Sequence, residues 1–125
     1  MLNNSSTAQK NTTQQQLEDM VRGLAQSLEV GFTDRTEEPE EGMEEPEPIM
    51  DFLETVLDIE WIVASDKQTL LGARLLVAFG GPNVTIDTRR QVVEGAWWLD
   101  SFSVGYCTTE GTEALDDALE MLWSC

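Results

Sequence analysis

Apolar and polar residues alternate over the second half of the chain, a pattern that a sheet of short strands satisfies and a helix does not. Three segments carry this period-two pattern: Ile59–Val63, Val84–Ile86 and Val93–Leu99. Leu70–Phe79 is a longer apolar run, which predicts a central strand. The turns SDKQT, GGPN and TRRQ separate these four segments. Successive strand residues face opposite sides of a sheet, so the pattern predicts a four-stranded antiparallel meander. Phe102–Cys107 is expected to add a short edge strand.

Apolar residues at helical spacing mark three further segments. The spacing of Leu17, Met20, Val21, Leu24 and Leu28 predicts an amphipathic helix over Gln14–Leu28, with Thr13 as N-cap and Gly31 as stop. Ile49–Leu57 and Thr112–Trp123 are expected to form shorter helices. The predicted fold class is therefore α+β: an antiparallel sheet of four to five strands with helices packed on one face.

Composition divides the chain into four parts. Residues 1–13 are Asn, Ser, Thr and Gln with little apolar content, and we expect them to be disordered. Residues 14–32 hold the amphipathic helix. Residues 33–48 are an acidic Glu/Pro linker, because proline favours extended chain. Residues 49–125 form the α+β domain.

The charge is strongly acidic and unevenly placed. The chain carries 24 Asp and Glu against seven Lys and Arg, a formal charge of -17 over 125 residues. From Glu37 to Glu60 there are eleven carboxylates and no base. Such a surface repels nucleic acid and anionic lipid and attracts basic proteins. We therefore expect neither direct nucleic-acid binding nor membrane association.

No catalytic signature accompanies this charge. The chain has no histidine, so Ser-His-Asp and Cys-His arrangements cannot form, and no dinucleotide or phosphate-binding glycine motif is present. Asp87, Glu94 and Asp100 could in principle hold a divalent cation, but a solvated sheet face is the favoured interpretation. We predict no enzyme activity, no cofactor and no metal.

Cys107 and Cys125 fit a cytoplasmic protein with reduced thiols. No apolar stretch is long enough to span a membrane, and the first residues lack the apolar core of a secretory signal. Two cysteines without histidine cannot make a four-ligand zinc site within one chain. A disulfide between them is not indicated.

The first helix and the paired tryptophans each leave two interpretations open. The stripe of the helix either packs on the chain's own sheet or pairs with a second copy or a partner. In the last predicted strand, Trp97 shares its side with Val93 and Leu99 and is expected to belong to the core. Trp98 then shares its side with Glu94 and Asp100. It is either an exposed protein-binding anchor ringed by acids or is covered by the first helix or Phe102.

Three interpretations of the acidic run compete: a solvated tether, recognition of a partner by charge, and imitation of nucleic acid. The run presents one charge per ~5 Å if extended at ~3.1 Å per residue, whereas one DNA strand presents one per ~3.4 Å. Imitation of nucleic acid therefore requires a second row of acidic residues, either from the folded domain or from a second copy of the chain. The candidate partner-binding residues are Glu37, Glu38, Glu40, Glu41, Glu44, Glu45, Glu47, Glu94, Trp98 and Asp100.

The stretch GARLLVAFGGPNVTIDTRRQVVEGAWWLD, followed by an acidic helix ending in LWSC, resembles small acidic proteins of phages and mobile elements in gut bacteria. The shared GGPN turn and Trp-Trp strand are structural, so the resemblance implies a fold and carries no active site. Small acidic proteins of such elements include anti-CRISPR and anti-restriction inhibitors. The resemblance thus implies an inhibitor acting in the cytoplasm of a bacterial host cell.

Together these observations predict an acidic, non-enzymatic inhibitor. Its expected partner is a basic nucleic-acid-binding protein, for example a CRISPR effector such as Cas9, with DNA mimicry as one mode of binding. One alternative is a scaffold, as a homodimer or larger oligomer, assembled through the N-terminal helix. A metal-dependent enzyme is the least favoured alternative.

Overall fold

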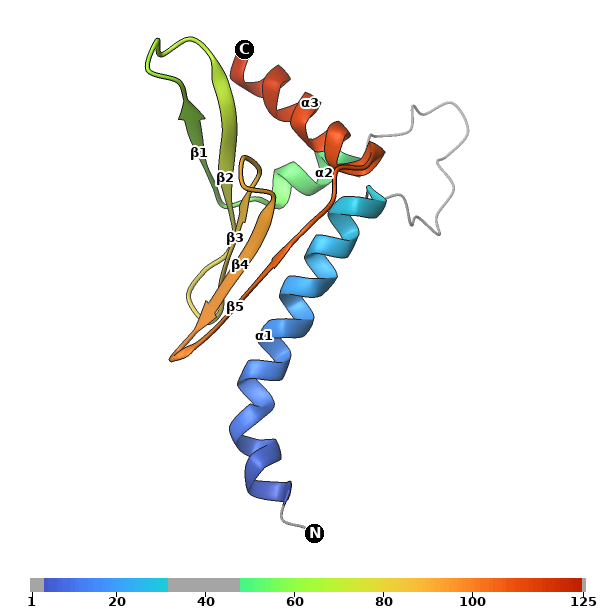
Figure 1. The fold of residues 1–125 in the computed structure, drawn as a ribbon, viewed down its shortest axis with the longest axis vertical. Helices are drawn as coiled ribbons and strands as arrows, with labels where there is room; N and C mark the ends of the chain where they lie inside the picture. Colours follow the sequence, from blue (N-terminus) through green and yellow to red (C-terminus); the bar gives the residue numbers. More distant parts are fainter. Residues whose placement is uncertain (1–3, 32–47, 125) are drawn as a thin grey trace.

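A computed structural model describes residues 4–31 and 48–124 of the chain (Figure 1). A long helix and a short helix precede five strands, and a third helix follows them. In chain order the elements are α1 (Asn4–Val30), α2 (Pro48–Thr55), β1 (Asp58–Val63), β2 (Leu70–Ala78), β3 (Asn83–Asp87), β4 (Val92–Trp97), β5 (Asp100–Gly105) and α3 (Glu110–Ser124).

The five strands form one antiparallel sheet in the order β1-β2-β3-β4-β5, so each strand pairs with its neighbour in the sequence. The predicted α+β class is confirmed. The edge strand expected over Phe102–Cys107 exists as β5, which begins at Asp100. Short turns dictate this topology, because a hairpin connection leaves the next strand antiparallel beside the last.

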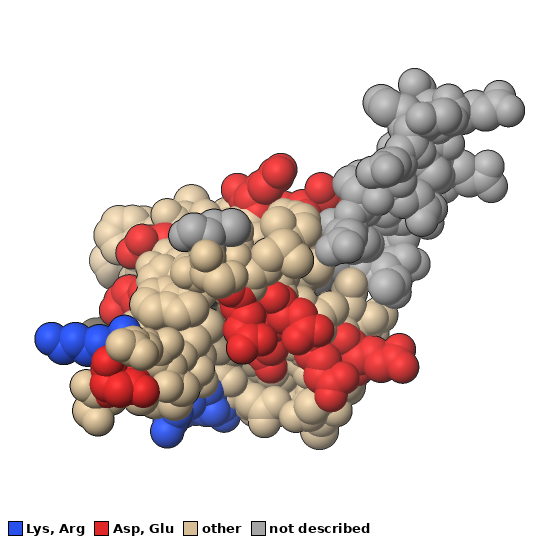
Figure 2. Space-filling model, turned by 90° about the horizontal axis from the view of Figure 1, so that it is seen from above, with Lys and Arg blue, Asp and Glu red and all other residues tan. Residues whose placement is uncertain are grey.

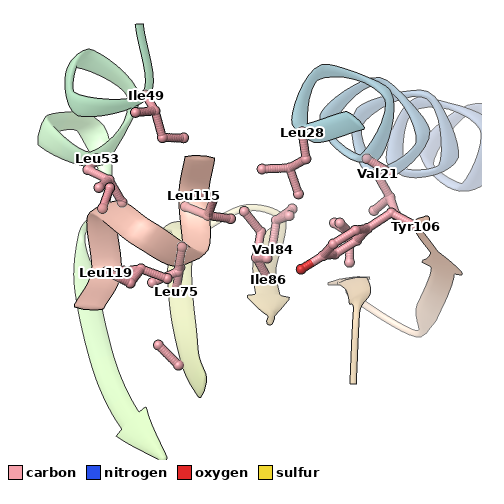
Figure 3. Packing of buried hydrophobic residues seen from close by; sticks show 14 of the residues in the cluster. Val21, Leu28, Ile49, Leu53, Leu75, Val84, Ile86, Tyr106, Leu115 and Leu119 are labelled. Carbon is pink, nitrogen blue, oxygen red and sulfur yellow. The ribbon is translucent and has the colours of Figure 1, made fainter. Parts of the chain in front are cut away.

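The helices cover one face of the sheet, where the core lies (Figure 1). Helix α1 packs on β4 and β5, and α3 packs on β2 and α1. Figure 3 shows Leu115 and Leu119 of α3 close to Leu75 of β2, with Leu28 of α1 turned toward the same cluster. These side chains are at most 2% exposed, so the alternating strand residues and the helical stripes meet in one hydrophobic core.

Helix α1 differs from the sequence prediction at its start. It begins at Asn4, so residues 4–13 are helical where disorder was expected, and Thr13 lies inside the helix instead of capping it. No glycine or proline occurs between Asn4 and Arg22, so nothing in the sequence interrupts the helix. The predicted stop is confirmed: Gly31 follows with a φ of 95°, and its N–H donates to the carbonyl of Ser27.

The apolar stripe of α1 belongs to the protein's own core. Leu17 and Val21 are fully buried, Leu28 is 1% exposed, and all three belong to the core cluster. Of the two interpretations of this stripe, packing on the chain's own sheet is therefore correct. The acidic segment between α1 and α2, predicted as a linker, lies outside the described residues except for Pro48, which is the first residue of α2.

Candidate protein-binding surfaces

Glu94, a predicted contact residue, is engaged in ion pairs on the open face of the sheet. Its carboxylate lies 2.7 Å from a guanidinium nitrogen of Arg90 and 3.7 Å from one of Arg74. Arg74 also lies 3.1 Å from the carboxylate of Asp87, which is almost fully buried. Two arginines therefore offset two acids here, and Glu94 is not part of an unpaired acidic surface as the sequence pattern predicted.

Trp98 is a turn residue, which corrects the prediction that it lies on a strand beside Glu94 and Asp100. Strand β4 ends at Trp97, which pairs with Asp100 of β5, so Trp98 and Leu99 form a two-residue hairpin loop. Trp98 is 89% exposed, so neither the first helix nor Phe102 covers it. Phe102 instead stacks against Arg22 of α1, whose guanidinium carbon is 4.7 Å from the ring centre.

The remaining predicted contacts divide into two groups. Asp100 begins β5 and is partly buried beside the hairpin loop. The seven glutamates from Glu37 to Glu47 lie outside the described residues. The structure therefore brings Trp98 and Asp100 to one end of the sheet and separates them from Glu94.

Helix α3 carries an acidic surface that the alternation and charge patterns of the sequence did not single out. Its five carboxylates are exposed and its sequence contains no base. At about 100° per residue they fall within an arc of about 120°, and the buried positions of the helix occupy the opposite side. We call this surface the α3 ridge; it consists of Glu110, Glu113, Asp116, Asp117 and Glu120.

The α3 ridge lies at the end of the molecule that Figure 2 shows from above, where acidic side chains form a broad band and basic ones lie at its margin. No ridge carboxylate belongs to any ion pair formed within residues 4–31 and 48–124. Unlike Glu94, these acids are not offset by a lysine or arginine of the described residues.

Two threonines and the end of α1 fix the ridge in place. The hydroxyl of Thr109 accepts a hydrogen bond from the N–H of Thr112, and the Thr112 hydroxyl accepts one from the N–H of Thr109, a reciprocal helix cap. The Thr109 hydroxyl also donates to the carbonyl of Glu29, at 2.6 Å. The carboxylate of Glu29 accepts a hydrogen bond from the N–H of Cys107. The ridge is thus rigidly oriented relative to α1.

The surroundings of Asp116 disfavour its charged form. Its pKa is raised above the ordinary carboxyl value, first by desolvation where α3 crosses the start of β2, then by repulsion from Asp117, Glu113 and Glu120. Burial likewise raises the pKa of the Tyr106 hydroxyl, and the negative charge of Asp116 adds to it. A basic side chain that approached the ridge would relieve this repulsion.

The cavities among the described residues are open to solvent, and two of them, of about 620 and 570 Å³, lie over β3 to β5 and beside the C-terminal half of α3. Another, of about 290 Å³, lies between α3 and β2, lined by Leu70, Leu119, Asp116 and their neighbours. Within the described part of the chain, no group of three or more potential ligands could hold a metal ion, so Asp87, Glu94 and Asp100 do not converge. Cys107 is an exposed free thiol, and Cys125 lies outside the described residues.

Comparison with known proteins adds no relative from which a function could be carried over. None of the helices in residues 4–31 and 48–124 has the length and apolarity needed to cross a bilayer. Searches against protein-family models, curated proteins and solved structures found no match to this chain.

Proposed function

We propose that this protein is an acidic, non-enzymatic inhibitor that binds a basic nucleic-acid-handling protein through the α3 ridge. The observation that carries the proposal is the ridge itself: five exposed carboxylates on one side of a helix without a base. The net charge of -17 supports the same kind of partner.

The charge density of the ridge supports imitation of a nucleic-acid strand. At ~1.5 Å rise per residue, the positions from Glu110 to Glu120 span about 15 Å and present one charge per roughly 3–4 Å. One strand of duplex DNA presents one per ~3.4 Å. A single helix thus reaches the density that the acidic Glu/Pro run lacks. A groove that binds one phosphate strand with Lys and Arg would attract this helix in the same way.

The scaffold alternative has weaker support. Assembly through the N-terminal helix would need an apolar stripe that is free to contact a partner, whereas the stripe of α1 is buried in the protein's own hydrophobic core. No observation favours a metal-dependent reaction.

A binding experiment with matched charge variants tests the proposal. The full-length protein is immobilised and exposed to lysate of a bacterial host at low and high salt, and retained proteins are identified. Inhibition of DNA cleavage by purified nucleases, including Cas9 with its guide, is measured in parallel. We expect basic nucleic-acid-binding proteins to be retained at low salt and released at high salt, because screening weakens exposed charge pairs.

The ridge variant Asp117→Asn with Glu120→Gln removes two charges from α3. The control Glu18→Gln with Asp19→Asn removes two from α1, so the net charge of the two variants is equal. Loss of binding in the ridge variant alone assigns the contact to the ridge. Equal behaviour of the two variants, or retention of no basic protein at low salt, contradicts the proposal.

A further inference from the structure

Three large apolar side chains are exposed at the end of the sheet far from the α3 ridge. Phe79 is 74% exposed, Trp98 89% and Leu99 fully exposed. Phe79 follows β2, and Trp98 and Leu99 form the loop between β4 and β5. In an antiparallel sheet these two turns lie at the same end, as Figure 1 shows. We call these three residues the apolar tip.

The backbone conformation at Trp98 indicates that a tryptophan at this position does not stabilise the fold. Its φ is 58°, whereas Leu99 is not among the residues with positive φ. A two-residue hairpin with positive φ at its first central position is a type II′ turn, in which glycine is the preferred first residue. A tryptophan there strains the backbone and gains no burial. An exposed residue of this kind is best explained by a contact made outside the chain.

The exposed apolar area of the tip is large enough for one anchoring contact but too small for a whole dimer interface. The two aromatic side chains expose on the order of 300 Å², given ~150–250 Å² for each such residue. A stable dimer needs ~800 Å² from each partner. Two convex tips that met face to face would therefore bury too little, and each copy would bring a charge of -17 to the contact.

The charges near the tip indicate which kind of partner, a lipid surface, a nucleic acid or a protein, can bind it. Asp100 is the only charged residue within two positions of a tip residue in the chain. Arg22 of α1 stacks on Phe102 of the same hairpin but lies 3.8 Å from the carboxylate of Glu18, which offsets its charge. The basic turn residues Lys67 and Arg90 lie at the opposite end of the sheet. An anionic lipid surface is therefore repelled, as is a nucleic-acid strand. A protein whose apolar pocket is bordered by Lys or Arg satisfies both the tip and the acid beside it.

We propose that the apolar tip inserts into an apolar pocket with a basic rim on a second protein, and that Trp98 is the anchor of this contact. The tip is a separate surface from the α3 ridge. Asp116 and Glu120 of the ridge lie beside the start of β2, and Phe79 follows its end. Eight to nine strand residues at ~3.3 Å each place the two surfaces roughly 25–30 Å apart. Failure of one proposal therefore leaves the other standing.

A photocrosslinking experiment tests the tip. Benzoylphenylalanine replaces Leu99 in the full-length protein, or Met20 as a control, since Met20 is exposed on α1 and belongs to neither the apolar tip nor the α3 ridge. After illumination in bacterial lysate, the crosslinked protein and peptide are identified by mass spectrometry. We expect an adduct from position 99 but not from position 20, with the crosslinked peptide beside an apolar pocket that carries Lys or Arg.

The identified protein is then purified, and its affinity is measured for wild type, Trp98→Gly and the control Met20→Ser. We expect Trp98→Gly to lose about 30-fold or more in affinity, the range of an interface hot spot, while Met20→Ser stays within about twofold of wild type. Because glycine suits this turn, an unchanged or raised melting temperature of Trp98→Gly separates lost binding from lost folding.

Four outcomes overturn the proposal. They are no adduct from position 99, an adduct only with a second copy of the chain, equal affinity of Trp98→Gly, and binding to phosphatidylcholine vesicles with 20% phosphatidylserine that depends on Trp98.

Discussion

Removal of two ridge charges is expected to stabilise the protein at low salt, although nothing is added to its core. In α3, Asp117 lies one turn from Glu113 and from Glu120, and Glu120 lies one turn from Asp116. The double variant Asp117→Asn with Glu120→Gln therefore removes three like-charge pairs. Each such pair destabilises a helix by ~0.2–0.5 kcal/mol, which sums to a gain of about 0.6–1.5 kcal/mol in the free energy of unfolding.

Thermal unfolding followed by circular dichroism measures this gain. For a domain of this size it corresponds to a rise in melting temperature of about 3–10 °C. Sodium chloride should raise the melting temperature of the wild type toward that of the variant, since the Debye length falls to ~3 Å at 1 M. The variant itself should respond less to salt.

The variant Glu94→Gln is the control of opposite sign. It also removes one acid, but this acid pairs with Arg90 and Arg74, so we expect a loss of roughly 0.5–1 kcal/mol. The reasoning is refuted if the ridge variant is no more stable than wild type at low salt, or if Glu94→Gln stabilises to the same extent. The second outcome would mean that net charge, and not the arrangement of α3, governs stability.

Three further changes probe the supports of the ridge. Gly111→Ala would place a Cβ 2.5 Å from a backbone oxygen at the end of α1, and a loss of about 2–3 kcal/mol is expected in urea unfolding; wild-type stability would contradict the close approach of α1 and α3. Thr109→Ala removes the helix cap and should cost about 1 kcal/mol, with Thr109→Ser restoring most of it. Asp116→Asn should stabilise the protein at neutral pH. The pKa of the Asp116 carboxyl is raised in the folded state, so the wild-type protein loses stability as the pH rises through that pKa. The variant's advantage should vanish at a pH well below ~3.9, and a constant advantage across a melting-temperature series in pH would exclude the mechanism.

The sequence was sufficient for the architecture because each strand pairs with its neighbour along the chain. Alternation and turn residues predict such a meander without knowledge of distant contacts. The start of α1 was missed because polar residues without glycine or proline are compatible with both a helix and disorder.

The site was predicted less well, for two physical reasons. The turn at Trp98 contains none of the usual turn residues, so alternation continued through it and placed the tryptophan on a sheet face. The pairing of Glu94 with Arg74 depends on strand register, which brings residues twenty positions apart together and leaves no local pattern. The α3 ridge could have been found, since helical spacing alone separates its acids from the buried leucines.

The packing of α1 on β4 and β5 has a consequence for synthesis on the ribosome. The first helix made must wait for nearly the last strands, because 75 residues separate Val30 from Gly105. At ~5–20 residues per second this delay is roughly 4–15 s. During it, the stripe of Leu17, Val21 and Leu28 has no sheet to cover it and is exposed to chaperones and to other nascent chains. Folding yield in the cell should therefore depend on how quickly translation reaches the hairpin that ends in β5.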